Sequence, residues 1–216
     1  MKKITIICEG YSELAFCKDI LEPHLRNFQI QLYYELTDHS KDGGITKWLN
    51  IKNQIIKIYE EDNDMVISTF FDFYGMNKSL KFPKWAESVE VDNKPNKMEI
   101  LEIGMFEDID DAIKFIPYIQ LHEYEALVFS DYNAFETLYD AQDANLVALK
   151  KICDNHINPE DINDIKITAP SNRLKNNIRR YNKISSGIEL ITIIGLETIR
   201  SKCPRFHNWI KNLEKI

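Results

Sequence analysis

Three apolar-rich runs predict strands in the first third of the chain. They are Lys3–Cys8, Gln31–Thr37 and Met65–Phe71. Between these runs, apolar residues recur at helical spacing over residues 12–26 and 48–59, which is typical of helices that bury one face. Strands that alternate with helices form parallel sheets with right-handed crossovers. This part of the chain therefore predicts a mostly parallel α/β sheet flanked by helices.

The remaining sequence predicts one more strand and a helical end. Residues 38–44 form a polar break, and residues 73–97 have the irregular pattern of a functional loop. A short acidic helix is predicted at Met98–Asp111 and a strand at Phe115–Leu121, where Pro117 indicates an edge position or a bulge. Further helices are predicted around Asp143–Asn155, Ser171–Tyr181, Gly187–Ile194 and Pro204–Leu213.

Charge is unevenly distributed along the chain. The formal net charge is −7, but Lys166–Ile216 carries eleven Lys and Arg against three acids, a net charge of +8, and the remainder carries −15. A basic end suits a surface that meets phosphates beside an acidic metal site. Alternatively, the basic end is complementary in charge to an acidic surface of this chain or of a partner. We expect an α/β part at residues 1–135 and a basic, mainly helical part at 136–216, packed together as one structural unit.

The four cysteines predict reduced thiols in a cytoplasmic protein. Cys8, Cys17, Cys153 and Cys203 form no CxxC pair, and no His lies at zinc-finger spacing from them. No segment approaches the roughly 20 apolar residues that a membrane-spanning helix needs. We therefore expect no membrane association.

An acidic residue follows the first predicted strand. In open α/β sheets, ligands gather outside the carboxyl ends of the strands, and Glu9 falls at that edge. A charged residue directly after a buried strand needs a partner. Gly10 permits a tight turn, and Glu13 lies in the first turn of the next helix, where a carboxylate interacts favourably with the helix dipole. Glu13 is either a further ligand or only a helix-start residue.

The third predicted strand delivers Asp72 in the same way. If the first and third strands are adjacent, Glu9 and Asp72 converge at one edge of the sheet. Two carboxylates, completed by water and substrate phosphate, make a site for Mg²⁺ or Mn²⁺. Alternatively, Asp72 caps the turn that follows its strand.

A third group of candidates follows the strand predicted at Phe115–Leu121. His122, Glu123 and Glu125 resemble a zinc-protease helix, but Ala126 stands where that motif needs its second His. The two acids share one face only in extended chain, so both can reach one metal only at a strand-to-helix junction. His122 is a ligand, a proton carrier or a hydrogen-bonded core residue.

Basic residues further along the chain are candidate substrate contacts. Arg173 and Lys183, with Arg179 and Arg180, are suited to bind phosphates, although solvated helix faces explain them as well. Phe206 and Trp209 are expected in the core. The sequence has no G-x-G-x-x-G, G-x-x-x-x-G-K-[ST] or G-x-S-x-G motif, which argues against a Rossmann cofactor site, a P-loop ATPase and an α/β-hydrolase.

With these residues identified, the chain resembles the bacterial domain of unknown function 4276 family. The resemblance extends over nearly the whole chain, and its blocks at His122–Leu127 and Ala169–Leu174 are the most specific. The motifs that carry it are Glu9-Gly10-x-x-Glu13, Asp72-Phe73-Tyr74-Gly75, Phe115-Ile116-Pro117-Tyr118-Ile119-Gln120-Leu121-His122-Glu123-Tyr124-Glu125-Ala126-Leu127, Asn158-Pro159-Glu160-x-Ile162-Asn163, Ala169-Pro170-Ser171-x-Arg173-Leu174 and Cys203-Pro204.

That family resembles Toprim domains, including those of OLD-type nucleases, which hold Mg²⁺ between a Glu after the first strand and acids after a later strand. The resemblance implies a Toprim-like α/β fold in which Glu9 is the first-strand acid and Asp72 the later one. A Toprim domain has a further acid two residues after the later one, where this chain has Tyr74. Glu123 or Glu125 would then supply the missing carboxylate.

The implied function is a Mg²⁺- or Mn²⁺-dependent nuclease that acts on DNA or RNA. The resemblance further implies an effector of anti-phage defence with an ATPase partner protein encoded nearby. The residues implied at the metal or in catalysis are Glu9, Glu13, Asp72, His122, Glu123 and Glu125. The rival is a non-catalytic adaptor that binds the ATPase or nucleic acid, which the missing second aspartate favours. Phosphatase or nucleotide-transfer chemistry would use the same acids, and a homo-oligomer is compatible with each function.

Overall fold

The computed structural model of the chain describes residues 1–38, 44–162 and 166–216. Within this part of the chain there are two compact units. Unit 1 comprises Met1–Leu121 and Trp209–Ile216, and unit 2 comprises His122–Asn208. Most of the polar break predicted at residues 38–44, and Asn163 of the sequence motifs, lie outside the described residues. The division into domains at residues 135 and 136 stays a prediction.

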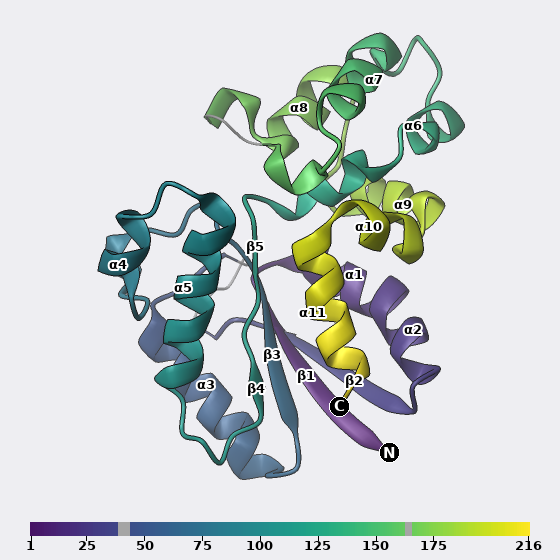
Figure 1. The fold of residues 1–216 in the computed structure, drawn as a ribbon. Coiled ribbons are helices and arrows are strands. Elements are labelled where there is room, and N and C mark those ends of the chain that lie inside the picture. The colour runs from purple at the N-terminus through teal and green to yellow at the C-terminus, as the bar shows by residue number, and fades with distance from the viewer. Residues whose placement is uncertain (39–43, 163–165) are drawn as a thin grey trace. The chain divides into compact units, whose positions relative to one another are not determined.

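Unit 1 is built on a five-stranded parallel sheet in the order β2-β1-β3-β4, with β5 pairing β3 further along (Figure 1). The strands are β1 (Lys2–Cys8), β2 (Ile30–Leu36), β3 (Val66–Asp72), β4 (Phe115–Ile116) and β5 (Ile119–Gln120). All seven residues of β3 are buried, and its apolar residues, with the small Ser68 and Thr69, suit a central strand covered on both faces. The predicted α/β fold with a parallel sheet is confirmed.

Helices cover both faces of this sheet. In Figure 1, α3 and α5 lie on one side of the strands and α1 and α2 on the other. The helical elements of unit 1 are α1 (Tyr11–Phe16), a π-helical turn (Cys17–Leu21), α2 (Glu22–Arg26), α3 (Trp48–Glu61), a 3₁₀ turn (Lys78–Leu80), α4 (Trp85–Val89), α5 (Lys94–Glu107) and the end of α11 (Pro204–Glu214).

The side chains of β3 alternate between two cores. Ile67 and Phe71 belong to the cluster formed with the buried faces of α3 and α5. Phe70 points to the other face, where its ring lies 5.8 Å from that of Phe16 and 4.9 Å from that of Trp209. Side chains that alternate between the two faces are typical of a strand, so β3 contributes residues to the hydrophobic cores on both sides of the sheet.

The strand predicted at Phe115–Leu121 is interrupted. Two-residue strands β4 and β5 flank Pro117 and Tyr118, and each pairs with β3. Pro117 has no N–H to donate, and the Thr69 hydroxyl takes the place of a backbone partner: it donates to Tyr118 O at 3.0 Å and accepts from Tyr118 N at 2.9 Å. Both pairings keep the same register, so no residue is inserted and the interruption is not a bulge. Among the described strands β4 lies at the edge of the sheet, the other position that Pro117 indicated.

The helix predicted at Met98–Asp111 begins and ends about one turn earlier. It is α5, and Asn93 Oδ1 caps its start by accepting a hydrogen bond from Asn96 N at 3.0 Å. Asparagine is a favoured N-cap residue, and Pro95 fits the first turn because that turn has N–H groups without helical partners.

Unit 2 is helical in its described residues, which confirms the predicted helical C-terminal extension. Its elements are a 3₁₀ helix (Tyr124–Ser130), α6 (Asn133–Leu138), α7 (Leu146–Asn155), 3₁₀ turns (Pro159–Asp161 and Lys166–Thr168), α8 (Pro170–Asn177), α9 (Ser185–Ile194), α10 (Leu196–Lys202) and the start of α11. Leu127, Phe135, Leu174 and Phe206 are fully buried. Across the part of the chain that the structure describes, no helix is both long and apolar enough to cross a membrane.

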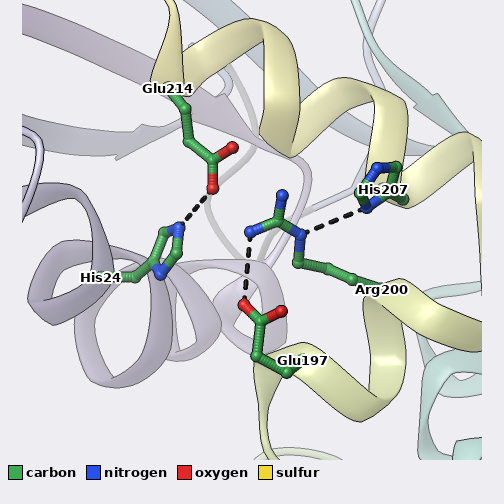
Figure 2. A network of polar contacts seen from close by, with 5 residues as sticks. All are labelled: His24, Glu197, Arg200, His207 and Glu214. Atoms are coloured by element: carbon green, nitrogen blue, oxygen red, sulfur yellow. Dashed lines mark hydrogen bonds and ion pairs between the residues drawn. The ribbon is translucent and has the colours of Figure 1, made fainter.

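Polar side-chain contacts link helices within each unit, as Figure 2 shows. In unit 1, His24 Nε2 of α2 and Glu214 Oε1 of α11 are 2.7 Å apart. In unit 2, Arg200 Nη1 of α10 lies 3.3 Å from Glu197 Oε1, and its Nε donates to His207 Nδ1 of α11 at 3.3 Å. These contacts hold the two parts of α11 against their own units.

Candidate functional site

The carboxyl ends of β1 and β3 bring Glu9 and Asp72 together. The strands are adjacent and parallel, with Cys8 paired to Phe70, and Glu9 N donates to Phe70 O at 3.1 Å. One residue pair further on, Asp72 N donates to Glu9 Oε2 at 2.9 Å. The two residues therefore lie next to each other at one edge of the sheet in unit 1, through the main chain of Asp72 and the carboxylate of Glu9. Convergence of the two carboxylates stays a prediction. Their role as metal ligands stays a prediction.

Glu13 lies at the same end of β1. It is buried, and its Oε2 is 3.0 Å from the position that a Cβ on Gly10 would occupy. Its carboxylate therefore folds back over the backbone next to Glu9, and Gly10 favours this close approach without an unusual φ. A side chain at position 10 would require the carboxylate of Glu13 to shift slightly.

Two polar residues at this edge were missed by sequence reasoning. Gln120 pairs with Asp72 across β5 and β3, is fully buried, and accepts a hydrogen bond from Tyr118 Oη at 2.6 Å. Asp38 follows the end of β2 and is exposed, and its N donates to Gln54 Oε1 at 2.8 Å. Their signal in the sequence is the one that identified Glu9 and Asp72, a polar residue at the end of an apolar strand.

The donor chemistry of this edge fits Mg²⁺ or Mn²⁺. Carboxylate oxygens are the ligands that these hard cations prefer, and Mg²⁺ often takes only one or two protein carboxylates and keeps several waters. Glu9 and Asp72 supply such a pair. The described residues contain no group of three or more His, Cys, Asp or Glu side chains that could hold a metal ion.

The acids of unit 2 make structural contacts. Glu123 Oε2 accepts from Ser171 N at 2.9 Å, and its Oε1 accepts from Ser171 Oγ at 3.0 Å. Ser171 is in the first turn of α8, whose N-cap is Ala169, a residue with no side-chain acceptor. Glu123 therefore caps this helix from 48 residues away. The contact joins the two most specific sequence blocks.

Replacing Ser171 by alanine is expected to lower the free energy of unfolding by about 1 kcal/mol, the typical effect of losing a capping hydrogen bond. The substitution removes the Oγ contact and leaves the Ser171 N–H contact to Glu123 in place. Urea denaturation monitored by circular dichroism measures the change. Ser185→Ala at the exposed start of α9 is the control, and an equal change in both variants contradicts the capping role of Glu123.

Glu125 makes an ion pair within unit 2, and His122 is buried. Glu125 is fully buried, and its Oε1 lies 3.2 Å from Nζ of Lys183, which is 43% exposed. Burial, and next the negative charge of Glu125, raise the pKa of the Tyr181 phenol. His122 is buried with φ 71, a left-handed conformation that is uncommon outside glycine. Lys183 thus pairs with a buried carboxylate of its own unit.

The other predicted phosphate contacts differ in how far they are engaged. Arg173 Nε donates to Thr168 O at 2.6 Å, so part of its guanidinium stabilises the start of α8. Arg179 and Arg180 are exposed beyond the end of that helix. The structure places all of these residues in unit 2, whereas Glu9, Glu13 and Asp72 are in unit 1.

A second long-range capping contact was not predicted from the sequence. Glu160 is fully buried; its Oε2 accepts from Arg205 N at 3.0 Å and its Oε1 from Phe206 N at 3.1 Å. These N–H groups start α11, directly after Cys203 and Pro204. A residue with a small side chain, Ala169 or Cys203, thus precedes the proline that begins α8 or α11. A glutamate distant in sequence caps each helix.

The four cysteines are free thiols, as predicted. Cys8, Cys17 and Cys203 are buried, and Cys153 is partly exposed. Cys8 Sγ and Cys17 Sγ lie 3.7 Å apart, too far for the roughly 2 Å of a disulfide bond. Burial raises the pKa of the Cys8 thiol, so it packs as a small apolar side chain beneath the acidic edge.

Comparison with known proteins identifies the family. Neither the curated proteins nor the solved structures contain a match to this chain. A family model described as a domain of unknown function (DUF4276) matches residues 8–214, nearly the whole sequence. The matched span includes every motif on which the resemblance rests. The chain belongs to the DUF4276 family.

Proposed function

We propose that this protein hydrolyses phosphodiester bonds of DNA or RNA with Mg²⁺ or Mn²⁺ held by Glu9 and Asp72. The observation that supports this proposal is the 2.9 Å hydrogen bond from Asp72 N to Glu9 Oε2 at the carboxyl ends of two adjacent parallel strands. Ligands of open α/β sheets bind at this edge, and carboxylate oxygens are the ligands that Mg²⁺ and Mn²⁺ prefer.

The residues of the chain have distinct tasks in this proposal. Asp72 N–H fixes one oxygen of Glu9 and so orients its carboxylate toward the edge. Glu13 adds a second negative charge beside Gly10, which strengthens the attraction for a cation. A bound divalent cation would supply an activated water and offset the charge that develops on the scissile phosphate.

The biological setting follows from the family resemblance and is part of the same proposal. The protein would act as an effector of anti-phage defence together with an ATPase partner. The proposed metal site does not use Glu123 and Glu125 as ligands, because both make contacts within unit 2. The proposal therefore stands on two carboxylates, with water and substrate phosphate as the other ligands.

A second candidate is a non-catalytic adaptor with the same fold. Tyr74 stands where Toprim domains have a further acid, and both oxygens of Glu123 cap α8. These two observations reduce the number of carboxylates for catalysis. An adaptor would bind its ATPase partner or nucleic acid without binding metal.

The proposal is tested with a variant that keeps the shape of the site. In Glu9→Gln/Asp72→Asn, the amide oxygen introduced at position 9 can still accept from the N–H of residue 72, but both charges are lost. We expect wild-type protein to release heat on titration with Mn²⁺ in a calorimeter and to cleave plasmid DNA or tRNA. The double variant is expected to lose both properties.

The matched control is Glu90→Gln/Asp92→Asn, which removes two exposed acids elsewhere in unit 1. It is expected to bind metal and to cleave like wild type. Equal metal heat and equal cleavage in wild type and in the Glu9/Asp72 variant would contradict the nuclease proposal. Partner capture without metal binding would favour the adaptor.

A further inference from the structure

An exposed tyrosine follows each acid of the candidate site by two residues. Tyr11 follows Glu9 and is 48% exposed, and Tyr74 follows Asp72 and is 37% exposed. Because β1 and β3 are adjacent and parallel, both tyrosines leave the sheet at the same edge as the acid pair. Two exposed aromatic rings at the edge that carries the acids offer faces on which a flat ligand can stack.

The chain after Asp72 is an ordered loop rather than a loose connection. At its ends, the Phe73 and Trp85 rings stack 6.3 Å apart, while Met76 and Phe82 are buried in the core of unit 1. A Cβ at Gly104 of α5 would lie 2.9 Å from a backbone oxygen of this loop, so the helix packs tightly against it. Loops of roughly 6–16 residues with neighbouring ends and packed side chains are frequently functional.

Two lysines of this loop point outward. Lys78 and Lys81 are both exposed, and they belong to one 3₁₀ turn and its C-cap. Among the residues that the structure describes, neither forms an ion pair, whereas Lys84 pairs with Glu107 at 2.7 Å. Figure 1 shows the chain leaving β3 at the carboxyl end of the sheet on its way to α4, so this loop starts at the acid pair.

We infer that this edge binds single-stranded nucleic acid, with bases stacked on Tyr11 and Tyr74 and phosphates held by Lys78 and Lys81. Unpaired bases offer faces that aromatic side chains can stack on, whereas the bases of a duplex are stacked on each other. The lysines supply the attraction that an acidic edge in a chain of net charge −7 lacks. This inference rests on the proposed function, because that function places the cleaved bond at this edge. It adds that the substrate is single-stranded.

Binding is measured separately from cleavage, by fluorescence anisotropy of wild-type protein in EDTA. The probes are labelled single strands of DNA and of RNA, which distinguish the two backbones, and the matching duplexes. We expect at least one single strand to bind about tenfold more tightly than its duplex. Tyr11→Leu/Tyr74→Leu keeps apolar bulk but removes both rings, and we expect it to weaken single-strand binding about a hundredfold, since each lost stacking contact contributes about tenfold.

The lysines are tested by the salt dependence of binding. Lys78→Gln/Lys81→Asn removes both charges, and Asn tolerates the left-handed conformation of residue 81. The slope of log affinity against log salt is expected to become shallower by about 1.4, since each phosphate contact on a single strand contributes about 0.7. Lys18→Gln/Lys57→Gln, at two exposed lysines on helical elements of unit 1, is expected to leave the slope closer to that of wild type.

Tyr33→Leu is the control for the tyrosines, because Tyr33 is 41% exposed on β2. The inference is overturned if duplex and single strand bind equally, or if the Tyr11/Tyr74 variant binds like the Tyr33 variant. Selective single-strand binding without cleavage in Mn²⁺ supports the inference and contradicts the nuclease proposal alone. Metal-dependent cleavage that the Tyr11/Tyr74 and Lys78/Lys81 variants retain at full rate supports the nuclease proposal and overturns the inference.

Discussion

Replacing Glu160 by alanine is expected to lower the free energy of unfolding by about 3 kcal/mol, because it leaves one buried and one partly buried N–H group at the start of α11 without an acceptor. Its carboxylate is fully buried and accepts from Arg205 N and Phe206 N at 3.0 and 3.1 Å. The side chain of Cys203, which precedes the helix, has no oxygen with which to replace it. Urea denaturation followed by circular dichroism measures the loss.

Asp161→Ala is the control for this prediction. Asp161 lies in the same 3₁₀ turn as Glu160 but is exposed, so its removal is expected to change the free energy of unfolding by less than about 0.5 kcal/mol. A Glu160→Gln variant refines the test, because its amide has one acceptor oxygen and can satisfy only one of the two N–H groups. It is expected to fall between wild type and Glu160→Ala. Equal stability of Glu160→Ala and Asp161→Ala would contradict the capping role.

The contribution of Glu160 is also expected to depend on pH. Burial raises the pKa of this carboxyl above its ordinary value, although the N–H groups of Arg205 and Phe206 oppose the shift. The folded state therefore binds the proton more tightly than the unfolded state does. The stability difference between wild type and Glu160→Ala should be largest below the unfolded pKa and decline as pH rises through the folded pKa. Denaturation series between about pH 4 and pH 7 measure it.

The central strands could be predicted closely from the sequence. The run predicted at Lys3–Cys8 is β1 (Lys2–Cys8), and the run at Met65–Phe71 is β3 (Val66–Asp72). Both strands are covered on two faces, so apolar residues occupy consecutive positions on both faces of each strand, and these runs mark the elements. The same logic placed Glu9 and Asp72 at strand ends, where the change from apolar to acidic is visible in one sequence.

Other parts depended on contacts that a single sequence does not display. Residues 73–97 were predicted as irregular, yet they contain α4 and the start of α5. Their order comes from tertiary packing, such as the stacking of Phe73 on Trp85. In the sequence, the prolines and the glycine of this region indicated an irregular segment, and no apolar spacing predicted its helices.

The hydrogen-bond partners of Glu123 and Glu160 could not be predicted from the sequence either. Glu123 meets Ser171 across 48 residues, and Glu160 meets Arg205 across 45. In the sequence, Glu123 was interpreted as a ligand because it follows a predicted strand, the same context as Glu9. Both carboxylates accept a backbone N–H, but Glu9 does so at the end of β3, whereas Glu123 meets the first turn of α8 with both of its oxygens.

Trp209 is central to the core beneath the acidic edge. It is 3% exposed, and its ring stacks on Tyr118 at 4.5 Å with an interplanar angle of 7°. It also contacts Phe70 at 4.9 Å, and its Nε1 donates to Ser68 Oγ at 2.9 Å. Phe70 and Ser68 belong to β3, so this indole supports the strand that ends in Asp72.

Trp209→Ala is therefore expected to lower the free energy of unfolding by about 4 kcal/mol, the order observed for large-to-small changes of buried aromatic residues. Trp209→Phe keeps most ring contacts and loses the hydrogen bond, so it is expected to lose only about 1 kcal/mol. Urea denaturation by circular dichroism compares the two. Hydrogen exchange of the Asp72 amide, which donates to Glu9 Oε2, should accelerate more in Trp209→Ala than in Trp209→Phe because the end of β3 opens more readily. Unchanged exchange at Asp72 in a destabilised Trp209→Ala would show that the acidic edge is held independently of this core.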